Sequence, residues 1–189
     1  MITFSAFTGA GVAMGLGAMG AAIGEGYTAG EANTAISRNP DISGDIFKNM
    51  LVGQAVAESA SIFALVVAIL MLFLDVPTDN LLKGAALFGA GLCMGFGAVG
   101  SGVGSGFPGG QACLGISRQP AAASRLTTGM LIGSAVCQTP AIFSMVIALR
   151  LIFMDFSHLP LAPTWAAILG AGLSTGLAAI GSGYGGGLA

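Results

Sequence analysis

Five long apolar runs dominate the chain, and their length restricts its fold more than any other feature. They cover residues 3–37, 46–74, 81–117, 126–153 and 162–189. At a rise of about 1.5 Å per residue, a helix of about 20 residues crosses the roughly 30 Å hydrocarbon core of a membrane. Only 7% of the residues are charged, against roughly 25% in soluble domains. The sequence therefore predicts an all-α, multi-pass integral membrane protein with four full transmembrane helices and a fifth.

Short polar links separate the runs and predict antiparallel helical hairpins. The links are SRNPDISGD at residues 37–45, DVPTDN at 75–80, SRQPAAASR at 117–125 and DFSHLPLAP at 155–163. Pro40 and Pro120 prevent helix continuation in the first and third links. Most lysines and arginines lie in or beside these two links. By the positive-inside rule, both links are cytoplasmic and the N-terminus lies outside.

The second part of the chain repeats the first. MLVGQAVAESASIF at residues 50–63 aligns with MLIGSAVCQTPAIF at residues 130–143 (130 − 50 = 80), and seven of fourteen positions are identical. Such self-similarity indicates duplication. A third copy begins near residue 170, and its second helix is absent from this sequence. We expect hairpins at residues 1–79 and 80–157 and an incomplete repeat at 158–189. Either the final residues reach water through a cavity, or the natural chain continues.

Glycine recurs four residues apart in the odd-numbered runs, for example at Gly11 and Gly15 and at Gly91 and Gly95. Small residues at this spacing let helix backbones approach closely in lipid. The even-numbered runs are instead rich in Leu, Ile, Val and Phe. We therefore expect the glycine-rich helices to form an inner layer and the bulkier helices to lie outside, against lipid.

Two acids are expected at one depth inside the first hairpin. Glu25 precedes Asp41 in the turn by 16 residues (41 − 25), and Glu58 follows it by 17 (58 − 41). Ionised acids are costly in a bilayer and two like charges repel, so the pair is expected to hold one proton, or a proton and a bound cation. A structural hydrogen bond is the alternative role for Glu58.

Other chemistry finds no support in the sequence. The three cysteines, Cys93, Cys113 and Cys137, lie in apolar runs without a CxxC spacing and are interpreted as small apolar residues. We find no nucleotide loop, metal-ligand cluster or nucleophile triad, so we expect no bond-breaking chemistry and no cofactor. The net charge of -2 does not favour a nucleic-acid partner.

These features together resemble the rotor-ring c subunits, or proteolipids, of F-type and V-type rotary ATP synthases, in their fused multi-hairpin form. The resemblance covers residues 4–155 and rests on the Gly-rich first helix, the SRNPD turn and AVAES around a mid-membrane acid. It implies a ring of many copies in membrane lipid, with the glycine helices inside. It also implies a stator subunit with an essential arginine, and central-stalk subunits at residues 37–45 and 117–125. Such a protein is not itself catalytic; it carries H+ or Na+ and couples ion flow to ATP synthesis or hydrolysis.

The resemblance also assigns an ion site. Its members are the carboxylates of Glu58 and Glu25, the backbone carbonyl of Val56 and the hydroxyl of Ser59. Ala60 and Phe63 replace the Thr and Tyr of the fuller sodium motif ESTGIY, so H+ and Na+ both remain open as the transported ion.

The second copy does not keep this site. Ser105, Gln138 and Thr139 stand where the first copy has Glu25, Glu58 and Ser59. Pro140 follows them and is expected to kink the helix. We therefore expect one working site for two or more hairpins, which lowers the number of ions moved per ATP and favours pumping over synthesis. A bacterial or archaeal cell membrane is the expected location, in a ring of identical or mixed subunits. The alternative from another class is a structural or pore-forming membrane oligomer in which Glu58 makes only a packing hydrogen bond.

Overall fold

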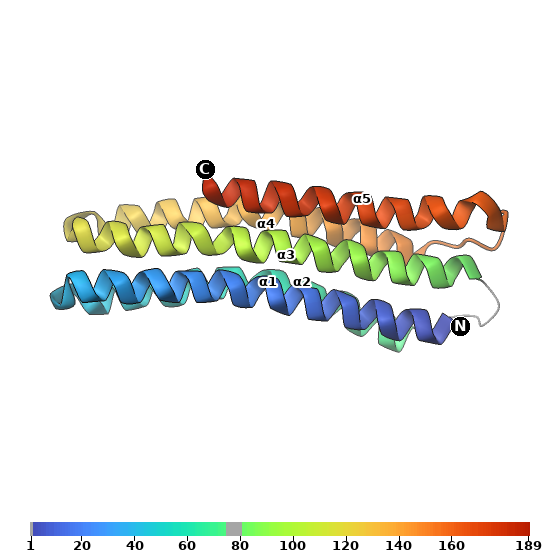
Figure 1. Ribbon diagram of the computed structural model, residues 1–189, viewed down its shortest axis with the longest axis horizontal. Coiled ribbons are helices and arrows are strands. Elements are labelled where there is room, and N and C mark those ends of the chain that lie inside the picture. The colour runs from blue at the N-terminus through green and yellow to red at the C-terminus, as the bar shows by residue number, and fades with distance from the viewer. Residues whose placement is uncertain (1, 75–80) are drawn as a thin grey trace.

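The computed structural model describes residues 2–74 and 81–189, and its described part consists of five long helices joined by short connections (Figure 1). The helices are α1 (Ile2–Arg38), α2 (Ser43–Phe73), α3 (Leu81–Arg118), α4 (Ala123–Phe153) and α5 (Leu161–Leu188). All five are long and apolar enough to cross a membrane. The predicted all-α, multi-pass membrane fold is thus confirmed. The predicted link at residues 75–80 lies outside the described residues.

One turn of 3-10 helix closes each hairpin at the same point of the repeat, at Pro40–Ile42 and at Pro120–Ala122. Each turn begins with its proline, a position where a missing backbone N–H costs little. The side-chain amide of Asn39 donates to the Ser117 carbonyl oxygen at 3.3 Å. This bond joins the residue before the first turn to the last turn of α3, so both hairpins end at the same level.

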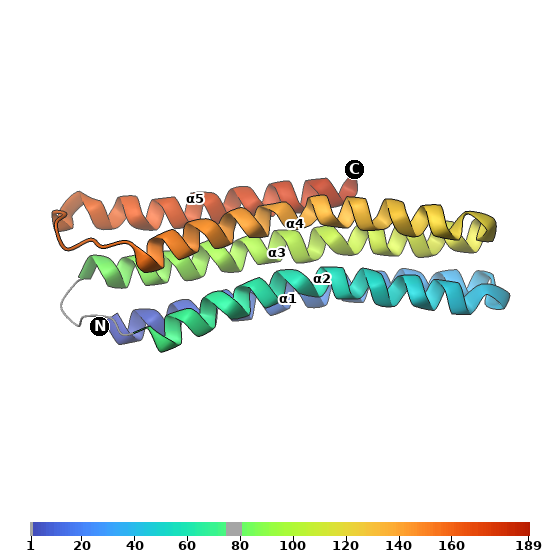
Figure 2. The same ribbon diagram turned by 180° about the vertical axis from the view of Figure 1, so that it is seen from behind.

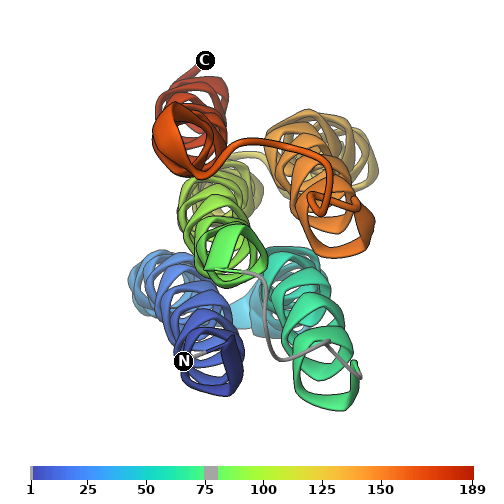
Figure 3. The same ribbon diagram turned by 90° about the vertical axis from the view of Figure 1, so that its right-hand side faces the viewer.

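The helices form two layers. Viewed along the bundle, α1, α3 and α5 lie in one row, and α2 and α4 lie beside them in a second row (Figure 3). The view from behind shows α2 and α4 in front of the first row (Figure 2). α3 contacts each of the other four helices. The glycine pattern predicted this separation of the glycine-rich helices from the bulkier ones.

Glycine permits the close spacing within the first row. A Cβ added to Gly91 on α3 would lie 2.2 Å from the Gly9 carbonyl oxygen on α1. On the opposite side of α3, a Cβ on Gly104 would lie 2.0 Å from the Gly183 carbonyl oxygen on α5. Real carbon atoms do not approach backbone oxygen so closely, so any larger residue would force these helices apart.

The helix limits differ from the predicted ones by a few residues. α2 begins at Ser43 and α4 at Ala123, where the apolar runs suggested residues 46 and 126, because each 3-10 turn leads directly into its helix. In α5, the backbone at Ala162 is extended (φ -109°, ψ 134°), so the regular helix begins after it. These shifts lie at the ends and leave the middle of each helix unchanged.

Candidate functional site

Glu25 and Glu58 lie on facing helices at one level. The side-chain amide of Gln54 on α2 donates to the Glu25 carbonyl oxygen on α1 at 3.3 Å. One turn further along α2, Ala57 faces Gly24, where an added Cβ would lie 3.3 Å from that of Ala57. The two carboxylates are close enough to repel each other. The first hairpin therefore brings both acids together near the middle of its length.

Their surroundings are open. Glu58 is exposed and Glu25 is partly buried in the isolated chain. Across residues 2–74 and 81–189, the Glu58 carboxylate accepts no hydrogen bond; its backbone oxygen accepts one from the Ser61 hydroxyl at 2.8 Å. The Glu58 carboxylate therefore lies open to the surroundings of the isolated chain.

The other two residues assigned by resemblance make a different set of contacts. The Ser59 hydroxyl donates to the Val56 carbonyl oxygen at 2.6 Å. The same oxygen accepts a second bond, at 2.8 Å, from the side-chain amide of Gln138 on α4. The structure thus places the Val56 carbonyl at the junction of the two hairpins, whereas the Glu58 side chain, two residues further along α2, is exposed.

The second copy forms a closed, neutral counterpart. The Gln138 amide nitrogen lies 2.8 Å from the Ser105 hydroxyl oxygen, and both side chains are buried. Thr139 is exposed and lies outside this cluster. α4 continues through Pro140, and the backbone N–H of Ala141 donates to the Ser101 hydroxyl at 3.0 Å.

Sequence reasoning missed two polar side chains that support the sites. Gln54 donates to the Glu25 carbonyl oxygen, and Ser134 donates to the Ser105 carbonyl oxygen at 3.1 Å. The two donors occupy equivalent positions of the repeat (134 − 54 = 80). A polar residue at the same repeat position inside an apolar run was the available signal.

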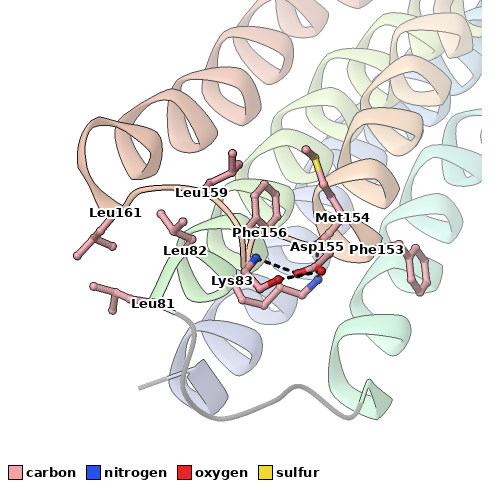
Figure 4. A pocket seen from close by; sticks show the side chains of 10 residues that line it. Leu81, Leu82, Lys83, Phe153, Met154, Asp155, Phe156, Leu159 and Leu161 are labelled. Atoms are coloured by element: carbon pink, nitrogen blue, oxygen red, sulfur yellow. Dashed lines mark hydrogen bonds between the residues drawn. The ribbon is translucent and has the colours of Figure 1, made fainter.

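The structure also has a pocket of about 610 Å³ at the end of the bundle opposite the two turns, lined by neither acid of the pair (Figure 4). Lys83 lies in this pocket near the start of α3 and donates hydrogen bonds to the carbonyl oxygens of Ile152 and Met154. These bonds fasten the start of α3 to the end of α4. In the following loop, the backbone N–H and hydroxyl of Ser157 both donate to Asp155 and hold the pKa of that carboxyl below its ordinary value.

The described residues contain no cluster of side chains that could hold a metal ion. No group of three or more His, Cys, Asp or Glu side chains lies together there. The three cysteines are buried and form no disulfide bonds: Cys93, Cys113 and Cys137.

Comparison with known proteins gives consistent matches along the two hairpins. The family model for the C subunit of ATP synthase matches residues 8–71 and again residues 88–151. The ATP synthase c subunit of Natranaerobius thermophilus is 51% identical over 65 residues, a match covering 34% of this chain and 74% of that protein. The ATP synthase c subunit of Dehalococcoides mccartyi is 53% identical over 64 residues, a match covering 34% of this chain and 84% of that protein. The corresponding protein of Alkaliphilus oremlandii is 44% identical over 73 residues, a match covering 39% of this chain and 82% of that protein.

Proposed function

Because this chain belongs to the family of ATP synthase c subunits, in a duplicated form with fused hairpins, we propose that Glu58 is the carboxylate on which it carries an ion across the membrane. As a c subunit, the chain is part of a c-ring within a rotary ATP synthase. In this proposal each Glu58 takes up an ion from one side, moves with the ring, and releases the ion to the other side. Ion flow is thereby coupled to ATP synthesis or hydrolysis.

The exposed Glu58 carboxylate, which accepts no hydrogen bond from the described residues, is the observation that carries the proposal. An acid kept for packing would be buried and hydrogen-bonded, since an unsatisfied carboxylate in a membrane costs several kcal/mol. The structural-oligomer alternative therefore has less support than ion transport. Glu25 at the same level supplies a second carboxyl for the shared proton.

The contacts of Val56 favour H+ over Na+ within this chain. Sodium needs several oxygen ligands, whereas a proton needs only the carboxyl and one acceptor. The Val56 carbonyl accepts from Ser59 and from Gln138 at the hairpin junction, so it is not available as a ligand for a metal ion at Glu58. Carbodiimide labelling of Glu58 should therefore be unchanged by added Na+ at high pH. Protection by Na+ would show that sodium is the transported ion.

The charge distribution supports an orientation and a set of partners. Arg38, Lys48, Arg118 and Arg125 lie at or near the end of the bundle that carries the two hairpin turns. We place this end in the cytoplasm, with the turns against central-stalk subunits and the N-terminus outside, in a bacterial or archaeal cell membrane. A stator subunit would supply an arginine opposite Glu58. Particle imaging of the ring distinguishes a ring of identical subunits from a mixed one.

The test replaces Glu58 in the assembled enzyme. Glu58→Gln keeps the shape of the side chain but removes its exchangeable charge, so ATP-driven ion uptake into proteoliposomes should be abolished. Glu31→Gln, an acid nearer the turns, is the matched control and should retain uptake. Retained uptake in Glu58→Gln would refute the proposal. An ion-to-ATP ratio equal to that of a ring with a site in every hairpin would refute the reduced number of sites.

A further inference from the structure

The side chain of Gln138 joins the two hairpins inside the membrane. Its amide nitrogen donates to the Val56 carbonyl oxygen on α2 and to the Ser105 hydroxyl on α3, each at 2.8 Å. A primary amide has two N–H groups, so both donors are used. The side chain is only 7% exposed. One nitrogen atom therefore lies between two oxygen atoms from different hairpins.

The two side chains of this junction occupy the positions that hold the acid pair in the first hairpin. Gln138 is the equivalent of Glu58 (138 − 58 = 80), and Ser105 is the equivalent of Glu25 (105 − 25 = 80). Oxygens from these positions, together with a carbonyl oxygen, are a suitable environment for a small monovalent cation. At the junction of the hairpins, the Gln138 amide nitrogen lies between the Val56 and Ser105 oxygens and directs the positive ends of two N–H dipoles at them.

The surrounding bonds keep this junction closed. Ser134 donates to the Ser105 carbonyl oxygen at 3.1 Å, and the Ala141 N–H donates to the Ser101 hydroxyl at 3.0 Å. All three serines are fully buried. The remaining polar atom of Gln138, its Oε1, is buried without a partner among the described residues. An unpaired buried oxygen is costly, so Gln138 is held at this junction by the two hydrogen bonds that its amide nitrogen donates.

We propose that Gln138 is a covalently attached substitute for a cation in a second, inactive ion site formed by Val56 and Ser105 at the hairpin junction. The amide completes the site without a charge to exchange, so the junction passes the stator without loading an ion. Gln138→Glu removes the substitute cation and adds a carboxylate, and the altered site then takes up H+ or Na+ from solution. This inference rests on the proposed function of Glu58, but its test measures binding at position 138 and does not require Glu58 to carry an ion.

The test measures cation binding at position 138 in a Glu58→Gln background, by carbodiimide labelling and mass spectrometry across a range of pH and Na+ concentration. Other ionisable side chains near this level on the packed helices include Glu25 and Tyr27 on α1, Cys137 on α4 and Tyr184 on α5. Glu58→Gln alone records their contribution. Gln138→Glu should add one labelled carboxyl whose labelling changes with the concentration of H+ or Na+.

The effect of Ser105 on cation binding distinguishes a site in which Ser105 is a ligand from an acid that is only buried. Adding Ser105→Ala to Gln138→Glu should weaken cation binding by roughly 10- to 100-fold, the effect of one hydrogen bond at a charged group. An acid introduced by Thr139→Glu, at an exposed position, should be unaffected by Ser105→Ala. An absence of labelling at position 138 in the folded chain, or an equal effect on both acids, would overturn the proposal.

A second measurement needs no substitution in the site. If both N–H groups of Gln138 are bonded as described, its side-chain amide should resist exchange in deuterated water. The side chain of Gln111, exposed although it donates to Tyr27 at 2.9 Å, is the matched control and should exchange quickly. Equal exchange of Gln138 and Gln111 would contradict the substitute-cation role. Loss of ATP-driven uptake in Glu58→Gln has no bearing on either result.

Discussion

Replacing Gly91 by alanine tests the close approach of α1 and α3. The new Cβ would lie 2.2 Å from the Gly9 carbonyl oxygen and 2.6 Å from its Cα. Ordinary contact begins near 3.4 Å, so the backbones must separate by about 1.2 Å (3.4 − 2.2). Overpacking costs about 1–3 kcal/mol, and backbone atoms cannot rotate away, so we expect about 3 kcal/mol. Alanine regains about 1 kcal/mol of helix propensity. The net loss is about 2 kcal/mol, or roughly 30-fold in the unfolding equilibrium.

The assay is reversible unfolding of the purified chain in mixed micelles, followed by steric trapping or circular dichroism. Gly129→Ala is the matched control, because its added Cβ meets nothing within 4 Å. It should be neutral or stabilising by up to about 1 kcal/mol. If Gly91→Ala is as stable as Gly129→Ala, the close packing of the glycine-rich row is refuted.

Three further substitutions test contacts outside the acid pair. Asn49→Ala removes buried hydrogen bonds between α2 and its neighbouring helices, and should destabilise the chain by about 1–3 kcal/mol in the same unfolding assay. Asn33→Ala, at an exposed position, is the control and should have little effect. Lys83→Met frees two carbonyl oxygens at the end of α4 and should increase hydrogen exchange there; unchanged exchange would contradict the contact. Ser157→Ala should raise the pKa of Asp155, measured by NMR titration. Because folding depresses that pKa, the stability it contributes is present above the unfolded pKa and lost as pH falls through the folded one. The backbone N–H bond remains in Ser157→Ala, so an unchanged pKa would refute only the contribution of the hydroxyl.

The main features of the fold were predictable because they depend on local sequence. The length of the apolar runs predicted the five helices, and Pro40 and Pro120 predicted the two turns. The spacing of the glycines predicted the row formed by α1, α3 and α5. Helix limits were less accurate, since apolarity does not show that a 3-10 turn leads directly into α2 and α4. The ordinary hydropathy of a run contains no signal for such a turn.

The site was only partly predictable. Counting residues from the turn indicated that Glu25 and Glu58 share a level, because helix rise is regular. The same counting could not show that the Val56 carbonyl accepts from Gln138, since that contact depends on how the two hairpins rotate against each other. The supporting role of Gln54 also depends on this packing. Ion-site membership of Glu58, Glu25, Ser59 and Val56 stays a prediction.

Quantitative carbodiimide labelling of the assembled ring tests the central claim most directly. The account predicts modification at Glu58, one modified site per chain, and its loss in Glu58→Gln. Modification should also stop ATP-driven ion transport, and because the chains move as one ring, labelling of a minority of chains should already be enough to stop it. A Glu58 that stays unmodified under conditions that inhibit transport, or full transport by a ring labelled at every Glu58, would contradict the claim that this carboxylate carries the ion.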